Sequence, residues 1–325
     1  MKKLICLLMS VFVLLLCGCG ATPATDEETQ IPTETESTED MRDPNAPMTD
    51  GKTLKLLAIT SSFGLNTTEY LYDIAMAEGF TEVIVARLYT SGCTLEKHIN
   101  FAENNTPGYQ YTKRTDSGWT EIKEVNMRYG IMDEDWDIIF IQQSATESPL
   151  PNTYADYVPR LIEYVRQHKP DARFVWNMTW AFDPECGRAV FNDTFAGSQE
   201  LMYNALVSTV KEQIIDAKVD VDRIIPSGTA IQNARAAGSP KLTREMQTAT
   251  SVDHIHLNPL GRVISGYALF ATITDCAELK AINLENVPQA YHYPNDPQLT
   301  MTEETKTLIL NAVNNALKNP YEVTK

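Results

Sequence analysis

Three side chains whose types suit nucleophilic catalysis come from distant parts of the sequence. Ser62 follows the apolar run 54–59, whereas Asp253 and His256 stand three residues apart in the last third of the chain. A serine hydroxyl is too weak an acid to attack a carbonyl unaided. It needs a base to take its proton, and the base needs a carboxylate that fixes its tautomer. The spacing of Asp253 and His256 allows one loop to supply both groups, so the three residues indicate Ser-His-Asp chemistry.

Each of these signals also has an alternative explanation. Ser61 and Ser62 could make a turn or cap a helix. Asp253, His254 and His256 could ligate a metal ion, although the sequence shows no matching further cluster of ligand-type residues. Proton transfer and electrostatic stabilisation need no cofactor, so we expect neither a metal nor a cofactor.

Ser62 stands at the ligand-binding edge of a sheet only if the chain forms a parallel sheet. The run 54–59 is short, continuous and apolar, which is typical of a strand buried on both faces. Further strands are expected at 82–89, 136–142, 173–180 and 221–226, and helices at 67–77, 94–102, 154–167, 200–217, 229–237, 257–274 and 303–317. This alternation predicts an α/β fold with a parallel sheet of about five strands, interrupted by a β-hairpin at 109–124. In such sheets ligands bind beyond the carboxyl ends of the strands, where Ser62 stands.

The order of these segments resembles the SGNH (GDSL-like) hydrolase superfamily. Ser62 follows the first strand, Gly92 follows the second, and Asp253 with His256 precedes the last core helix. More narrowly, an uncharacterised SGNH-like bacterial family is similar over about residues 54–270, in the stretches LAITSSFGLNTTEYLYDIA, LYTSGCTLEKH, DWDIIFIQQ, WNMTWAF and IPSGTAIQNAR. The resemblance implies a three-layer α/β/α, flavodoxin-like fold. It also implies hydrolysis of an ester through an acyl-enzyme, commonly an acyl group on a carbohydrate.

The resemblance assigns roles to individual residues. Ser62 is then the nucleophile and a backbone donor to the oxyanion, Gly92 is the second donor, and Asp253 and His256 complete the triad. The superfamily supplies a third donor from an Asn after the third strand, where this chain has QQSAT at 142–146. We expect the side chain of Gln143 to serve instead, with Thr146 as the alternative that a gap-free register gives.

The sequence departs from the superfamily beside the nucleophile. Thr60-Ser61-Ser62 stands where the superfamily has Gly-Asp-Ser or Gly-Asn-Ser. Because threonine is β-branched and disfavours unusual backbone angles, this turn could aim Ser62 differently. A catalytically inactive glycan-binding protein is therefore one alternative function, and a lipase or thioesterase acting on acyl chains is another.

Two further residues are candidates for substrate contact. Trp180, expected near the carboxyl end of its strand, could stack against a sugar ring or could simply be buried. His98 could point toward the site, because the nearer relatives place a histidine there, or could lie on the surface.

The N-terminal region predicts export. Lys2 and Lys3 precede an apolar run and the sequence Leu16-Cys17-Gly18-Cys19, which resembles a bacterial lipobox with Cys19 as the lipid anchor. The region 21–50 is rich in Thr, Pro and Glu and cannot bury enough apolar surface to fold. We therefore expect a signal peptide at 1–19, a disordered acidic tether at 20–52 and one SGNH-like domain at 53–325. The protein would be held to a bacterial cell membrane, cytoplasmic or outer, through the lipid alone.

Charge limits the classes of binding partner, and the cysteine count limits the kinds of cross-link or metal site that the domain can have. The formal net charge is −16 and no cluster of Lys or Arg is present, which argues against nucleic acid or anionic lipid headgroups. We expect an acylated carbohydrate or another small ester as the partner. The domain holds Cys93, Cys186 and Cys276, an odd number without a CxxC pair, so neither a disulfide framework nor a structural zinc site is expected.

Overall fold

A computed structural model of the chain describes residues 46–239, 241–244 and 253–324. The predicted signal peptide at 1–19, the Cys19 anchor and the tether up to residue 45 lie outside the described residues. Within the described part, no helix is both long enough and apolar enough to span a membrane.

The central element of the domain is a seven-stranded sheet in the order β4-β3-β2-β1-β5-β6-β7. Its strands are β1 (Thr53–Thr60), β2 (Glu82–Tyr89), β3 (Tyr109–Thr115), β4 (Gly118–Val125), β5 (Ile138–Ile141), β6 (Arg173–Asn177) and β7 (Arg223–Ile225). The strands β2-β1-β5-β6-β7 pair in parallel, and counted alone in chain order they run 2-1-3-4-5. This is the flavodoxin-like order, whose ligand crevice lies at the carboxyl ends beside the first strand.

The predicted hairpin exists, but it extends the sheet. β3 pairs antiparallel with β2, and β4 pairs antiparallel with β3, so the sheet has seven strands rather than about five. The five strands expected from alternation are the parallel ones. The hairpin residues alternate in polarity as an edge pair with one solvated face does, which does not tell where the hairpin docks.

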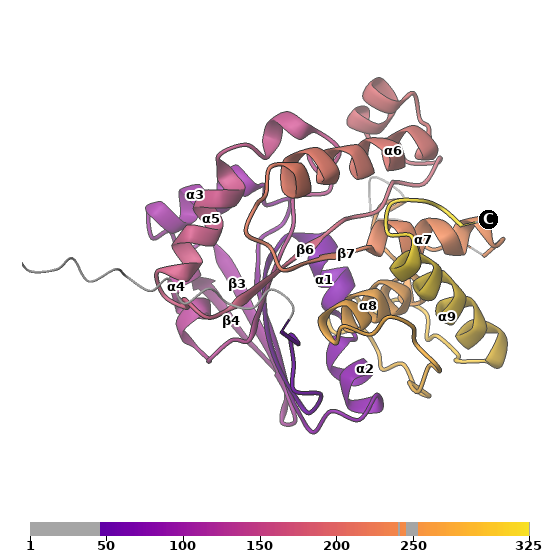
Figure 1. Cartoon of the computed structure of the whole chain (residues 1–325), viewed down its shortest axis with the longest axis horizontal. Helices are drawn as coiled ribbons and strands as arrows, with labels where there is room; N and C mark the ends of the chain where they lie inside the picture. The colour runs from indigo at the N-terminus through magenta and orange to yellow at the C-terminus, as the bar shows by residue number, and fades with distance from the viewer. Residues whose placement is uncertain (1–45, 240, 245–252, 325) are drawn as a thin grey trace, which may run out of the picture. The chain divides into compact units, whose positions relative to one another are not determined.

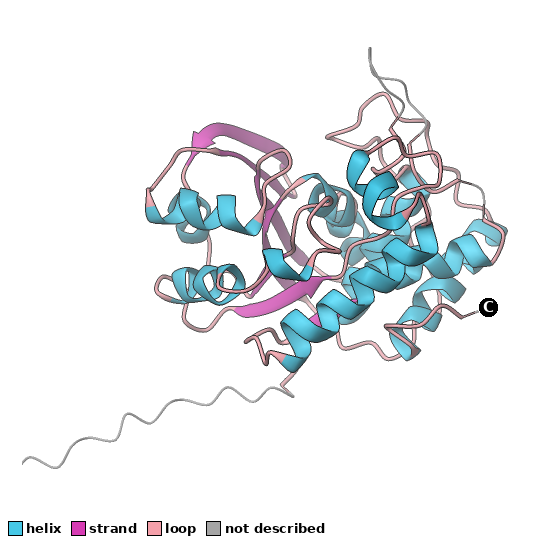
Figure 2. Ribbon diagram, turned by 90° about the horizontal axis from the view of Figure 1, so that it is seen from above, coloured by secondary structure: helices cyan, strands magenta, loops and turns pink. Residues whose placement is uncertain are grey.

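Helices cover both faces of the sheet (Figure 1). One group comprises α3 (Leu95–Glu103), α4 (Met127–Met132) and α5 (Tyr157–Arg166), and the opposite group comprises α1 (Ser62–Thr68), α2 (Leu71–Ala77), α7 (Ser227–Ala236), α8 (Pro259–Ile273) and α9 (Glu303–Lys318). The remaining helical segments are η1 (Pro151–Thr153), η2 (Val190–Thr194), α6 (Gln199–Val210) and η3 (Lys211–Asp216). Figure 2, turned by 90°, again shows the strands between helices. The three-layer α/β/α arrangement is thus confirmed.

Helix α8 lies at the centre of its layer, and every residue from Pro259 to Ile273 is buried. It packs against α1 and α2 on one side and α7 and α9 on the other. Such a helix is buried all round rather than amphipathic, and Arg262 is the one charged residue that it buries. It fixes the loop before it, which carries Asp253 and His256, against α1.

The helix expected at 67–77 is in fact two helices, α1 and α2. The hydroxyls of Thr67 and Thr68 donate to the carbonyls of Phe63 and Gly64 one turn back, at 3.3 and 2.7 Å. Such back-bonding bends helices. α1 starts at Ser62, with only Ser61 between it and the end of β1, so the serine turn of the sequence is the first turn of a helix.

The folded domain begins earlier than the predicted boundary at residue 53. Met48 is only 4% exposed, and its backbone amide donates to Asp275 Oδ2 at 3.2 Å. The carbonyl of Ala46 accepts a hydrogen bond from Arg173 Nη1 at 3.2 Å. The end of the predicted tether is therefore attached to the domain through Ala46 and Met48, whereas residues 50–52 are exposed.

Candidate active site

Ser62 is the serine of the pair that a ligand can reach. It is partly exposed at the first position of α1, whereas Ser61 is 1% exposed and its hydroxyl accepts a hydrogen bond from Gln142 Nε2 at 3.3 Å. Ser61 stands at the N-cap position, yet its side chain makes no cap hydrogen bond. The amide of Gly64 already donates to the carbonyl of Ser61 at 3.2 Å, so the amides of Ser62 and Phe63 are the ones at the start of α1 that could face an anion.

The missing glycine at position 60 does not distort this turn. Ser61 has φ −104°, and neither Thr60 nor Ser62 is among the described residues with positive φ, so no residue here needs glycine. The side chain of Thr60 occupies the space over Gly64, where an added Cβ would collide with Thr60 and lie 2.9 Å from Phe140 Cε1. Gly64 therefore makes room for the threonine.

Asp253 and His256 form a hydrogen-bonded pair. His256 Nδ1 and Asp253 Oδ2 are 2.8 Å apart, and Asp253 Oδ1 accepts from the backbone amides of Ile255 and His256 at 3.1 and 3.0 Å. Burial alone would raise the pKa of Asp253, but the hydrogen bonds and charge of His256 and the two amides outweigh it and lower the pKa to about 2. The carboxylate is thus ionised and oriented toward the imidazole, which leaves Nε2 for proton exchange.

Neighbours of Ser62 and His256 join helix α1 to the histidine loop. The rings of Phe63 and His256 meet edge to face with centroids 5.9 Å apart. The backbone amide of Leu257 donates to Asn66 Oδ1 at 2.6 Å. The structure therefore brings together the residues that follow Ser62 and the residues that flank His256.

Trp180 is a structural part of the same contact rather than a sugar platform. It is 0% exposed, its ring stacks on Phe63 with centroids 4.0 Å apart, and Nε1 donates to the carbonyl of Ile255 at 2.9 Å. A sugar cannot reach it. The hypothesis of substrate stacking is wrong because the tryptophan fills the space between α1 and the histidine loop.

His98 is buried as well, so it neither contacts substrate nor lies on the surface. It is 0% exposed, stacks on Tyr109, and shares a 2.8 Å hydrogen bond between Nδ1 and the Tyr109 hydroxyl. Burial lowers the pKa of His98 to about 3. It is therefore a neutral core histidine at physiological pH.

Gly92, expected to be an oxyanion donor, lies in the turn that follows β2, the strand that pairs with β1. It is exposed and has φ +58°, a left-handed conformation that favours glycine. A 3.2 Å hydrogen bond from Cys93 N to Thr90 O closes the turn.

Gln143 does not have a free amide to hold an oxyanion. It is 0% exposed, and its Nε2 donates to the carbonyl and hydroxyl oxygens of Thr153 at 2.9 and 3.1 Å. Its Oε1 accepts from the amides of Leu95 and Ser144. The expected role is corrected: Gln143 ties the start of α3 to the loop after β5. Thr146, the alternative, is partly exposed.

Comparison with known proteins identifies the family of the chain. Residues 55–286 match the family described as "Domain of unknown function (DUF4886)". The chain belongs to this family. A DUF4886 family protein from Bacteroides uniformis ATCC 8492 has a similar solved structure, with 29% sequence identity, a TM-score of 0.70, and coverage of 84% of this chain and 98% of that chain. The recognition of an uncharacterised family is thereby confirmed.

More distant solved structures have esterase names. A proposed SGNH hydrolase from Slackia heliotrinireducens is 17% identical with a TM-score of 0.43, over 68% of this chain and 100% of that chain. The family 3 carbohydrate esterase of Clostridium thermocellum is 12% identical with a TM-score of 0.37, over 69% and 96%. No match to a curated protein was found.

Sequence reasoning missed two residues that support the candidate site. Asn66 lies four residues after Ser62, so helical spacing places it on the same face of α1 as Ser62, and this signal could have revealed it. Gln142 donates to Ser61 and accepts from Asn177 Nδ2 at 3.0 Å. Both Gln142 and Asn177 are 1% exposed, so they support the serine turn from inside the domain and do not contact substrate.

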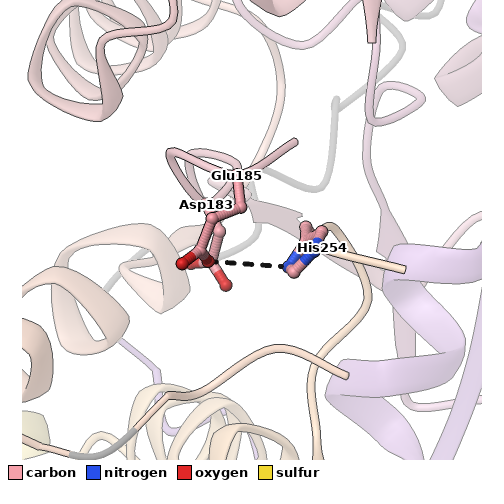
Figure 3. A group of neighbouring side chains, drawn as sticks. All are labelled: Asp183, Glu185 and His254. Atoms are coloured by element: carbon pink, nitrogen blue, oxygen red, sulfur yellow. Dashed lines mark ion pairs between the residues drawn. The ribbon is translucent and has the colours of Figure 1, made fainter. Parts of the chain in front are cut away.

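A different set of ligand-type residues lies beside the histidine loop (Figure 3). Asp183, Glu185 and His254 offer atoms that all lie within 4.8 Å of one another. Each carboxylate has a cation beside it, since Arg235 is 2.6 Å from Asp183 and Lys241 is 3.4 Å from Glu185. Of the three residues that the sequence offered as metal ligands, only His254 belongs to this group. The other two, Asp253 and His256, bind each other.

All three cysteines of the domain are free thiols. Cys93 and Cys186 are buried and Cys276 is partly buried. Burial raises the pKa of the Cys93 thiol to about 12, so it is unreactive at neutral pH.

Proposed function

We propose that this DUF4886 protein is a serine esterase in which Ser62 attacks an ester carbonyl. One observation carries the proposal: the Asp253–His256 pair, with its 2.8 Å hydrogen bond, lies against the helix turn that begins with the accessible Ser62. The His256 side chain is 20% exposed and Asp253 is 11% exposed. His256 thus reaches the surface, while the more buried carboxylate of Asp253 orients its ring through Nδ1.

The geometry supports a two-step mechanism. His256 Nε2 takes the proton of Ser62 as its Oγ bonds to the carbonyl carbon, and the imidazolium then protonates the departing alcohol. Water, deprotonated by His256, attacks the acyl-enzyme and releases the acid and free Ser62. Asp253 stays ionised throughout and stabilises the imidazolium, which agrees with its lowered pKa.

The oxyanion is held by backbone amides in this proposal. Ser62 N at the uncapped start of α1 and Gly92 N in the exposed turn after β2 are the two donors. Thr146 replaces Gln143 as the candidate for a third donor, because Thr146 is partly exposed whereas the Gln143 amide is buried and bonded to Thr153.

The substrate, location and partners are also proposals. We infer short acyl groups, in the first place acetyl, on carbohydrate; this rests on the resemblance of the motifs to SGNH enzymes. Export and anchoring through Cys19 rest on the sequence of residues 1–19. The accessible serine and the intact Asp-His pair favour catalysis over an inactive glycan-binding role.

A comparison of two adjacent serines tests the proposal. We expect the purified full chain to hydrolyse p-nitrophenyl acetate, and Ser62→Ala to lower kcat on the order of a thousandfold or more because the nucleophile is lost. Ser61→Ala is the matched control; it removes one hydrogen bond from Gln142 and should retain most of the rate.

Two results would contradict the esterase. One is full activity of Ser62→Ala. The other is a folded parent protein that hydrolyses neither this ester nor acetylated glycans, which would favour the glycan-binding alternative.

A further inference from the structure

The carboxylate of Asp253 has a partner besides the triad histidine. Arg244 Nη1 donates to Asp253 Oδ2 at 3.2 Å, the same oxygen that binds His256. The backbone of Arg244 is also attached to the loop: its amide donates to the carbonyl of His256 at 2.8 Å, and Thr243 forms an antiparallel bridge with Leu257. Arg244 therefore contacts both members of the pair, one through its side chain and one through its backbone.

A buried carboxylate holds the guanidinium of Arg244 in place. Arg244 Nε donates to Asp296 Oδ1 at 2.9 Å, and Arg262 Nη2 donates to Asp296 Oδ2 at 2.5 Å. The side chains of Asp296 and Arg262 are 1% and 0% exposed. A buried carboxylate shared by two arginines has little freedom, since moving it would leave a charge uncompensated.

Tyr293 links this cluster to the nucleophile helix. The guanidinium carbons of Arg244 and Arg262 lie 4.6 and 3.9 Å from its ring centroid, and its ring is 6.3 Å from that of His256. Its hydroxyl accepts a hydrogen bond from Asn66 Nδ2 at 2.8 Å. These contacts thus form a continuous chain from Asp253 through Arg244 and Tyr293 to α1.

We propose that Arg244 is a positioning residue that acts through Asp253. By filling the second acceptor direction of Oδ2, it fixes the plane of the carboxylate and hence the ring of His256. The catalytic consequence rests on the proposed esterase function. Asp296 and Tyr293, which hold Arg244, come from the segment beyond residue 286, where the match to the family ends.

A matched ion pair nearby serves as control for a purely structural role. Arg235 binds Asp183 Oδ1 at 2.6 Å with side chains 13% and 9% exposed, much as Arg244 binds Asp253. The described contacts of Arg235 do not include Asp253 or His256. We would compare Arg244→Gln, Arg244→Lys and Arg235→Gln in the full chain, with melting temperatures to show that each folds.

The first readout is independent of catalysis. In protein labelled with ¹⁵N-histidine, the Nδ1 proton of His256, identified by its loss in His256→Gln, reports the hydrogen bond to Asp253. We expect Arg244→Gln to shift or broaden this resonance, Arg244→Lys to restore it in part, and Arg235→Gln to leave it at the parental position. An unshifted, sharp resonance in Arg244→Gln would overturn the proposal.

The second readout is steady-state hydrolysis. A small displacement of a catalytic group costs on the order of ten- to a hundredfold in rate, so kcat should fall by that factor in Arg244→Gln with KM within twofold of the parent. An inactive parent whose resonance still responds to Arg244→Gln would refute the esterase and keep the positioning role. If the parent is active and Arg244→Gln changes neither kcat nor the resonance, the positioning role is refuted and the esterase is kept.

Discussion

At the scale of single residues, exposure separates the side chains that can do chemistry from those that support them. Ser62 and His256 reach the surface, whereas Trp180, His98 and Gln143 are buried and bonded. The sequence indicates residue types and their order along the chain, but the burial of a side chain depends on what packs over it. Three polar or aromatic residues near motif positions were therefore expected to meet substrate and instead hold the fold.

The buried His98 gives a prediction about stability and pH. Its pKa is lowered to about 3, so below the ordinary value of 6.5 the unfolded chain binds a proton that the folded chain does not. Its contribution to the free energy of unfolding is constant above pH 6.5 and falls as the pH drops toward 3, by up to about 1.4 kcal/mol per pH unit.

Urea unfolding at pH 6.5 and pH 5 checks this, with His98→Phe as the comparison, because phenylalanine can still stack on Tyr109 but cannot titrate. We expect the parent to lose roughly 1 to 2 kcal/mol more than the variant over this interval. His292, whose pKa is also lowered by burial, contributes equally to both proteins. Parallel losses in the two proteins would contradict the assignment.

At the scale of elements, the junction between β1 and α1 determines where the Ser62 side chain lies. Thr60 ends the strand, Ser62 begins the helix, and Gly64 receives the threonine side chain. The strand and the helices were predictable from apolar runs and periodicity. The break between α1 and α2 was not, because it depends on threonine hydroxyls that bond to their own helix.

Gly64→Ala is predicted to destabilise the protein and lower activity together. The new methyl would collide with Thr60 and approach Phe140, and overpacking of this kind typically costs about 1–3 kcal/mol. Thr60→Gly in the same chain should restore much of the melting temperature, because it empties the space. A Gly64→Ala variant as stable as the parent would show that Thr60 does not depend on Gly64.

At the scale of the whole molecule, the parallel pairing of the strands follows from the α/β alternation, and the flavodoxin-like arrangement was implied by the resemblance. The contacts of the segment beyond residue 286 could not be predicted: Tyr293 and Asp296 carry no motif, and only the fold brings them to Arg244 and the loop of Asp253 and His256. The domain also starts before residue 53, since Met48 is buried. Long-range contacts between irregular segments leave no periodic signal in a sequence.

The central claim is that Ser62 is a nucleophile activated by His256. The most direct test is labelling with a fluorophosphonate, which reacts with activated serines, followed by peptide mass spectrometry of the parent and His256→Ala. The account predicts a single modified serine, Ser62, and little or no label in His256→Ala. Label on Ser61 or another serine, or equal labelling of Ser62 without His256, would contradict it.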